Sequence, residues 1–210
     1  MQKANAGNEI VCLISVFSEN KESYMFHTPN ISIVSLQAKA INLPIIRKAT
    51  EGVKEKELDD LRDVIADAVR LYGIEGIVTG ALASNYQRER IQKLCDRLGI
   101  SCVNPLWGTD QVKVLNELVD LGFEVMISGV FAYPLGEDLL GARLDKKIIG
   151  ELTGYGEKYG INPAGEGGEI ETTVLDAPFF KKKIVVLDYE KMYRNNAGTY
   201  SVLDAKLADK

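Results

Sequence analysis

Short apolar runs alternate with longer amphipathic segments through the first half of the chain. Nearly every residue of 9–17 after the first is apolar, which is typical of a parallel strand buried on both faces. Leucine, valine, isoleucine and alanine recur at helical spacing through residues 55–72, which predicts an amphipathic helix. The same reading predicts strands at 43–46, 74–79 and 100–103 and helices at 30–41 and 84–98. This alternation predicts an α/β fold built on a doubly wound parallel sheet.

The second half has a different pattern. Helical spacing predicts helices at 110–121 and 145–159, and apolar runs predict strands at 123–131, 172–175, 184–187 and 200–203. We expect the last five residues to be frayed. A Pro-Leu-Trp-Gly string at 105–108 separates the halves. The prediction is therefore an α/β domain at residues 1–106 and a smaller α+β domain at 107–210.

Composition narrows the function classes. The 210 residues carry a net charge of −5 with no basic block, which argues against nucleic acid as a partner. No run approaches the roughly 20 apolar residues of a membrane helix, so we expect no membrane association. The three cysteines form no Cys-x-x-Cys pair and the chain has one histidine, which favours reduced thiols, a cytoplasmic location and no zinc site. Cys12 and Cys95 are expected to fill core space.

A glycine-rich acidic loop is the first candidate site. Glu166, Glu169 and Glu171 lie among three glycines at 165–168, directly before an apolar run. Glu169 and Glu171 are two residues apart, so in an extended chain they point the same way and would repel unless a cation, a proton or a cationic substrate lay between them. We expect such loop carboxylates to add little to packing. The alternative is a solvated Gly-rich hairpin.

A second candidate site follows the predicted strand at 74–79. The string from Gly80 to Ile91 reads as a turn and then a helix, with Ser84 as the N-cap. A helix N-terminus binds anions, and Arg88 lies one turn further on the same face, where its guanidinium could grip a phosphate. The alternative is an ordinary capped surface helix. Ser18, Gly80 and Asn104 all follow predicted strands, so they are expected at the carboxyl edge of the sheet, where ligands bind.

These strings together resemble the diphthine–ammonia ligase family of the adenine-nucleotide α-hydrolase (PP-loop ATPase-like) superfamily. The segments 18–28 and 103–108 resemble it as well. The resemblance implies a Rossmann-like, HUP-type domain and an ATP-dependent carbon–nitrogen ligase. Its reaction would amidate diphthine on elongation factor 2 through an acyl-adenylate, giving diphthamide, AMP and pyrophosphate. Its cofactors would be ATP and Mg²⁺. Its partners would be ATP or AMP, ammonium, elongation factor 2 carrying diphthine and, as one option, a second copy of the chain.

The resemblance also implies roles for individual residues. The nucleotide would be held by the strand-end and helix-cap residues Val16, Phe17, Ser18, Gly80, Ala81, Ser84 and Arg88. Substrate would be contacted by Tyr24, His27, Tyr86, Gln87 and Thr172. The catalytic residues would be Arg88, Glu166, Glu169 and Glu171. Glu169 and Glu171 would serve either Mg²⁺, ammonium or a quaternary ammonium.

One family feature has no counterpart. The Ser-Gly-Gly-Lys-Asp-Ser loop, which cradles the ATP phosphates, does not occur in these 210 residues. The first ten residues resemble the tail of the helix that follows that loop. We therefore expect the family's first strand, the phosphate loop and most of the first helix to be missing, with a gap or a replacement strand beside residues 9–17. Two other functions stay open: an ATP-pyrophosphatase-like enzyme acting on another acceptor, and a non-catalytic nucleotide-binding module.

Overall fold

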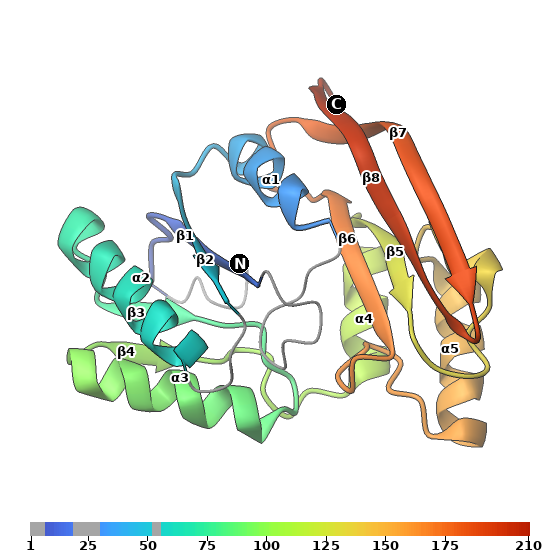
Figure 1. Ribbon diagram of the computed structural model, residues 1–210, viewed down its shortest axis with the longest axis horizontal. Coiled ribbons are helices and arrows are strands. Elements are labelled where there is room, and N and C mark those ends of the chain that lie inside the picture. The colour runs from blue at the N-terminus through green and yellow to red at the C-terminus, as the bar shows by residue number, and fades with distance from the viewer. Residues whose placement is uncertain (1–6, 19–29, 52–55) are drawn as a thin grey trace. The chain divides into compact units, whose positions relative to one another are not determined.

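The computed structural model of the protein describes residues 7–18, 30–51 and 56–210. The chain divides into two compact units, each described separately below (Figure 1). Unit 1 comprises Met1–Ile31 and Leu43–Gly108, and unit 2 comprises Ser32–Asn42 and Thr109–Lys210. The architecture is mixed α/β, with parallel strands in unit 1 and an antiparallel sheet in unit 2.

Unit 1 contains two separate pairs of parallel strands. Strand β1 (Leu13–Ser18) pairs with β2 (Ile45–Thr50), and β3 (Gly76–Val78) pairs with β4 (Ser101–Val103). The predicted strands and their parallel pairing are confirmed. The predicted doubly wound parallel sheet is present only as these two pairs, because no described strand joins them. The predicted gap beside residues 9–17 is present among the described residues.

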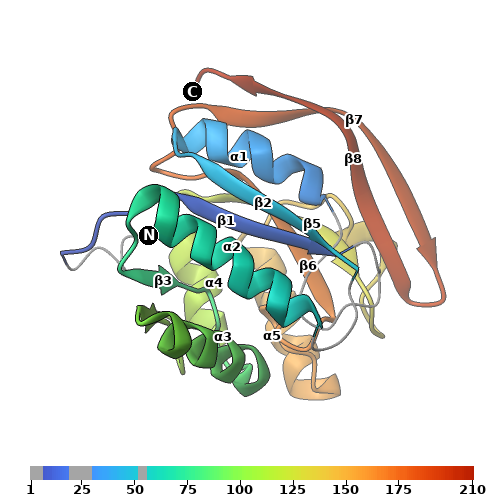
Figure 2. The same cartoon turned by 60° about the vertical axis from the view of Figure 1, so that its left-hand side comes forward.

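Helices α2 (Lys56–Tyr72) and α3 (Asn85–Leu98) complete unit 1. Figure 2 shows α2 running alongside β1 and β2. The two helices and β1 share one buried apolar cluster, formed by Val16, Leu61, Val64, Ile65 and Leu94. This cluster accounts for the helical spacing of apolar residues at 55–72. Apolar residues that recur every three to four positions lie on one face of α2, and that face packs against the strands.

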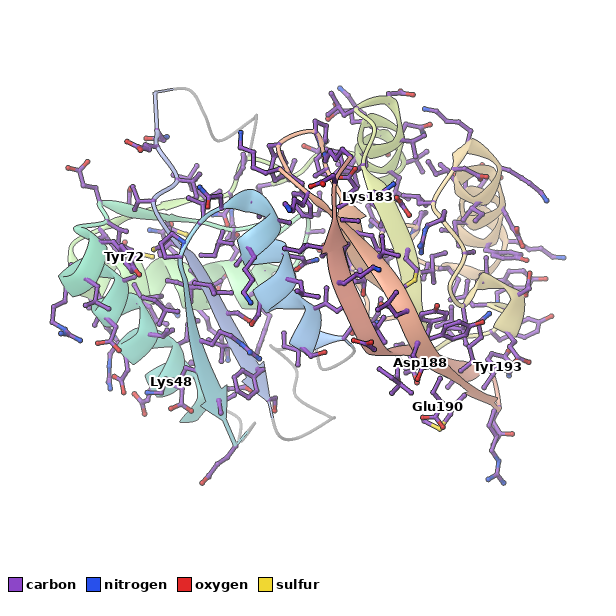
Figure 3. All side chains as sticks on the ribbon, turned by 90° about the horizontal axis from the view of Figure 1, so that it is seen from above. Lys48, Tyr72, Lys183, Asp188, Glu190 and Tyr193 are labelled. Atoms are coloured by element: carbon purple, nitrogen blue, oxygen red, sulfur yellow. The ribbon has the colours of Figure 1, made fainter. Side chains whose placement is uncertain are left out.

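Charged groups tie β2 to α2 at the surface of unit 1. Lys48 Nζ lies 3.4 Å from Asp60 Oδ1 and 3.2 Å from Asp63 Oδ2 (Lys48 is labelled in Figure 3). The side-chain hydrogen bond from Arg62, followed by that from Lys48, holds the pKa of Asp63 below its usual value. Such exposed pairs contribute only about 0–1 kcal/mol each, so the apolar cluster dominates the packing of α2.

Unit 2 is a four-stranded antiparallel sheet in the order β6-β5-β8-β7. Its strands are β5 (Glu124–Val130), β6 (Ile170–Asp176), β7 (Lys183–Arg194) and β8 (Ala197–Ala208). The last two form a long hairpin (Figure 1), with Asp188 and Glu190 exposed on β7 (Figure 3). Its two-residue turn is Asn195-Asn196, with φ of 53° and 58°, as a hairpin of matching twist requires. The expected fraying of the last five residues is wrong, because β8 extends to Ala208.

Helices cover this sheet with the help of a segment from the first half of the chain. The helices are α1 (Val34–Ile41), which follows a 3-10 turn η2 (Ile31–Ile33), then α4 (Gln111–Asp120), a second 3-10 turn η3 (Glu137–Leu139) and α5 (Lys146–Tyr159). Ile33 and Ala40 lie in the core of unit 2, and Ala40 O accepts a hydrogen bond from Lys181 N at 2.6 Å. Gln37 Nε2 donates to Val174 O at 2.8 Å. Residues 32–42 therefore belong structurally to unit 2. Within the described part of the chain, no helix has the length and apolar character needed to span a bilayer.

Candidate functional site

Several predicted residues lie at the strand ends of unit 1. Val16 and Ser18 are buried near the end of β1, and the ring of Phe17 lies 5.0 Å below the guanidinium of Arg47. After β3, Thr79 Oγ1 donates to Asn104 Oδ1 at 2.5 Å and accepts from Ala81 N at 3.3 Å. The hydroxyl of Thr79 thus joins the end of β4 to the loop that contains Gly80 and Ala81.

Helix α3 begins where the sequence predicts. Ser84 is its N-cap, with Oγ accepting from Gln87 N at 3.4 Å and its carbonyl accepting from Arg88 N at 3.1 Å. The first N–H groups of an α-helix have no partner within the helix, and the helix dipole adds positive potential there. The 14-residue helix α3 follows β3 after the loop 79–84, and its N-terminus therefore has the properties of an end that favours anions.

Arg88 is held by an aromatic face that sequence analysis did not assign to the site. Its guanidinium carbon lies 4.0 Å from the ring centroid of Trp107, and its Nη2 donates to Asn85 Oδ1 at 3.3 Å. The Trp107 segment is fixed to the same loop, because Gly108 N donates to Leu82 O at 2.9 Å. Stacking uses the flat face of a guanidinium and leaves its N–H edge for oxygen acceptors, which suits Arg88 to an anion.

The predicted substrate contacts of unit 1 have mixed positions. Tyr86 is half-buried, and the guanidinium of Arg90 lies 3.5 Å from its ring centroid, so a cation already covers one face of that ring. Gln87 contributes its backbone N–H to the Ser84 cap. Tyr24 and His27 lie outside the described residues.

The acidic loop of unit 2 is organised by Glu169. Its Oε1 accepts from Asn162 Nδ2 at 2.7 Å and from Asn162 N at 3.2 Å, and its Oε2 accepts from Gly167 N at 2.9 Å. Its backbone oxygen accepts from Phe131 N at 2.8 Å. The expectation that Glu169 adds little to structure is therefore wrong. Three N–H donors compensate its charge within the loop, so it needs no cation to be stable there.

Two glycines allow the loop to close on this carboxylate. Gly165 and Gly168 have φ of 76° and 84°, in the left-handed region. A Cβ at Gly165 would lie 2.2 Å from Ile170 O, so no other residue fits without displacement. Gly168 N donates back to Gly165 O at 2.9 Å. The glycine-rich string is therefore required by the path of the backbone around the Glu169 carboxylate.

The remaining acidic-loop residues have different settings. Glu171 lies on β6 opposite Gly129 of β5, and Thr172 follows it, exposed, on the other face of the sheet. Glu166 is half-buried in the loop. The two carboxylates proposed as metal ligands thus differ, since that of Glu169 turns back into its own loop. No cluster of three or more histidine, cysteine, aspartate or glutamate side chains suited to a metal ion occurs in the described part of the chain.

Gln111 and Asn162 support the acidic loop and were missed from the sequence. Gln111 Nε2 donates to Asn162 Oδ1 at 3.1 Å, and Gln111 Oε1 accepts from Ala164 N at 2.9 Å. Together with the bonds of Glu169, these contacts connect the start of α4 to the loop. The only local signal was the position of Gln111 directly after the N-cap Asp110, since a partner 51 residues away leaves no pattern.

Comparison with known proteins identifies the family. Residues 1–102 match the diphthamide synthase N-terminal domain, and residues 110–208 match the diphthamide synthase C-terminal domain. A human protein named diphthine–ammonia ligase is 35% identical over 205 residues, covering 89% of this chain and 76% of its own length. A zebrafish protein of the same name is 33% identical over 204 residues, with coverage of 89% and 80%. The chain belongs to the diphthamide synthase family, whose matched relatives carry the name of a ligase.

Relatives differ in how much of their length is matched. A fission yeast protein, also named diphthine–ammonia ligase, is 32% identical over 222 residues, which cover 98% of this chain. The matched region is 36% of the yeast protein, so the chain spans about a third of that relative.

Proposed function

We propose that this protein is an ATP-dependent ligase that amidates diphthine on elongation factor 2. The observation that carries the proposal is the match of both family domains along nearly the whole chain. We further propose a cytoplasmic location. We also propose a HUP-type arrangement for unit 1, which the parallel pairs β1–β2 and β3–β4 support.

In this proposal unit 1 binds the nucleotide. Val16, Phe17 and Ser18 end β1, and Gly80 and Ala81 follow β3, so all five lie at the carboxyl ends of parallel strands, where ligands bind in such sheets. Phosphate suits the open end of α3, where the helix dipole and first-turn N–H groups favour an anion. The Arg88 guanidinium, held flat by Trp107, directs its N–H edge to phosphate oxygens. ATP supplies the activating group, because AMP is a far better leaving group from a carbonyl carbon than hydroxide.

Unit 2 supplies the carboxylates. With its charge already met by Asn162 and Gly167, Glu169 positions the loop. Glu166 and Glu171, the other two carboxylates of this region, are proposed to attract ammonium or the quaternary ammonium of diphthine, and Thr172, on the other face of β6 from Glu171, is proposed to contact substrate separately. Carboxylate oxygens also suit Mg²⁺, which keeps several waters and is held through one or two carboxylates plus phosphates.

The test is AMP release by the 210-residue protein in the presence of ATP, Mg²⁺, ammonium and diphthine-bearing elongation factor 2. Arg88→Ala and Arg88→Lys should each lower kcat/KM by about tenfold or more, since lysine keeps the charge but loses the planar fork. Arg70→Ala is the matched control, because Arg70 is an exposed arginine on α2 paired with Asp67. Equal rates in all four proteins would contradict the assignment of Arg88.

A non-catalytic nucleotide-binding module is the second candidate. It is favoured by one sequence observation, the lack of a Ser-Gly-Gly-Lys-Asp-Ser string in these residues. A phosphate loop supplies several charged hydrogen bonds of about 1.5–3 kcal/mol each, so its lack should weaken ATP binding far more than AMP binding. Calorimetry with both nucleotides separates the candidates. Retained AMP binding with weak ATP binding, and no release of AMP in the presence of ATP and the diphthine-bearing acceptor, would support the module.

A further inference from the structure

Phe131 directly follows β5 and exposes its ring, although a phenyl ring has no polar group that favours water. The side chain is 41% exposed. Its ring covers Gly129, since a Cβ built on that glycine would lie 2.7 Å from Phe131 Cε2 and 2.9 Å from Cζ. The lack of a side chain at Gly129 therefore lets the ring lie on the strand. The acidic loop fixes the backbone here, because Phe131 N donates to Glu169 O at 2.8 Å.

The side chain of Glu171 lies beside this ring. Glu171 on β6 is directly opposite Gly129 on β5, so side chains at these two positions point to the same face of the sheet. Glu171 Cβ lies 3.0 Å from the point where a Cβ of Gly129 would be, and the edge of the Phe131 ring approaches the same point. The phenyl ring and the glutamate side chain therefore lie side by side over one glycine.

The other exposed aromatic rings of unit 2 already contact a partner ring. Tyr133 packs edge-to-face against Tyr159 with 5.3 Å between centroids, and Tyr189 stacks on Tyr200 at 4.5 Å. Among the residues that the structure describes, neither a ring nor a cation lies against Phe131 in this way. The exposed part of this ring is therefore accessible to a cation from solution.

An aromatic ring beside a carboxylate suits a quaternary ammonium better than it suits ammonium. A quaternary ammonium has no N–H group to donate, and aromatic faces attract it through the ring quadrupole. Ammonium carries four N–H donors, and removing them from water costs free energy unless oxygen acceptors replace the water. The carboxylate attracts both cations by charge. The ring is therefore the group that distinguishes between them.

We propose that Phe131 and Glu171 form the subsite for the quaternary ammonium group of the acceptor, and that Phe131 determines the preference for a methylated amine. The inference rests on the proposed function, because diphthine carries a quaternary ammonium. It deepens that function by assigning the methylated cation, and not ammonium, to this pair. Phe131 is a binding residue and takes no part in the chemical step.

The first test needs no turnover. Tetramethylammonium chloride is titrated into the isotopically labelled full chain and followed by NMR, with ammonium chloride at equal ionic strength as the control. The backbone amide signals of Gly129, Phe131 and Glu171 should shift with tetramethylammonium and saturate, but should not shift with ammonium. Equal shifts from the two salts would show a general effect of charge and overturn the proposal. So would the lack of any shift at these amides with tetramethylammonium.

Substitutions separate the aromatic face of Phe131 from its bulk. Phe131→Leu keeps an apolar side chain, and it should raise the Kd for tetramethylammonium about two- to fivefold, as a cation–π contact at an exposed site predicts. Phe131→Trp should bind at least as tightly as the parent protein. If the leucine and tryptophan variants bind alike, the ring only packs over Gly129 and the proposal fails.

Two further variants test the carboxylate and supply the control. Glu171→Gln should also raise the Kd about two- to fivefold, because it removes the charge at a partly exposed position. Tyr189→Leu is the matched control, because it removes an exposed ring that already stacks on Tyr200, and it should leave the Kd unchanged. An equal loss of binding in Tyr189→Leu and Phe131→Leu would place the cation elsewhere.

Kinetics connect the subsite to the proposed reaction. In the AMP-release assay, Phe131→Leu should raise the KM for diphthine-bearing elongation factor 2 and leave the KM for ATP and for ammonium unchanged. An unchanged acceptor KM in an active enzyme would overturn the subsite and leave the ligase proposal standing. If the parent protein releases no AMP, the ligase proposal fails, and the titration still decides whether Phe131 and Glu171 bind a quaternary ammonium.

Discussion

Replacement of Glu169 by glutamine should destabilise unit 2, even though the two side chains have nearly the same shape. The carboxylate accepts from Asn162 Nδ2 at 2.7 Å, Asn162 N at 3.2 Å and Gly167 N at 2.9 Å. Glutamine has one neutral oxygen in place of two charged ones. If that oxygen faces Asn162, the N–H₂ group faces Gly167 N, and if it faces Gly167, the N–H₂ group faces the two donors of Asn162. At least one charged hydrogen bond is lost.

Loss of a hydrogen bond to a charged group costs about 1.5–3 kcal/mol when buried, and Glu169 is only half-buried. We therefore expect a loss of about 1–2 kcal/mol in the free energy of unfolding. For a chain of this size each kcal/mol shifts Tm by about 2–4 °C, so the expected fall is about 2–8 °C. Differential scanning calorimetry measures the shift, and hydrogen exchange at Gly167 should accelerate at the same time.

Glu157→Gln is the matched control, since Glu157 is exposed on α5. Its Tm should stay within about 1 °C of the parent protein. If Glu169→Gln and Glu157→Gln melt together, the three donors do not depend on the charge, and the assignment of Glu169 as the organiser of the loop fails. If Glu169→Gln alone melts lower but AMP release falls no more than the folded fraction does, the residue positions the loop without contributing to catalysis.

Three further results are expected. Gly165→Ala should lower Tm, because the φ of 76° at this position and the Ile170 oxygen 2.2 Å from the new Cβ both oppose a side chain. Gly150→Ala, in open space on α5, should raise Tm because alanine has a higher helix propensity than glycine. Equal Tm shifts in the two variants would contradict this geometry. Burial raises the pKa of the Cys95 thiol to about 12, so the native protein should resist alkylation at Cys95 at pH 8. The stability gained from keeping that thiol neutral should be present below pH 9 and lost as pH rises toward 12. Rapid alkylation of Cys95 in the native protein, measured by mass spectrometry, would refute this. Ser84→Ala should cost about 0.5–1 kcal/mol of unfolding free energy in urea titration, the low end for an N-cap because its bond to α3 is 3.4 Å long; an unchanged midpoint would show that the cap is not used.

Local patterns predicted the elements of unit 1 well. Helix α3 begins after Ser84, where the sequence places it, because capping depends on residues within one turn of each other. Strand β3 lies within its predicted run at 74–79 but is shorter, and β1 begins four residues later than the predicted run at 9–17 and ends one residue later. The gap that the described residues leave between the two strand pairs explains the difference, since a run of apolar residues becomes a strand only where a neighbour pairs with it.

Long-range contacts could not be predicted from the sequence. The order β6-β5-β8-β7 places β5 beside strands that come about 40 and 70 residues later, and no local signal specifies such partners. The Trp107–Arg88 stack and the Gln111–Asn162 contact have the same origin. Glu169 was recognised as important for its charge, but its structural role required knowledge of which N–H groups the loop turns inward.

Helix α1 has a consequence for the order of folding. Ile33 and Ala40 lie in the core of unit 2, but they are synthesised about 70 residues before the rest of that unit. The antiparallel sheet can therefore close over its helix only after an intervening segment, Leu43–Gly108, has been made. Such a contact of high sequence separation carries a loop-closure cost and is slow to form. A fragment starting at Thr109 would expose the apolar surface that α1 covers, so we expect it to aggregate more readily than the full chain.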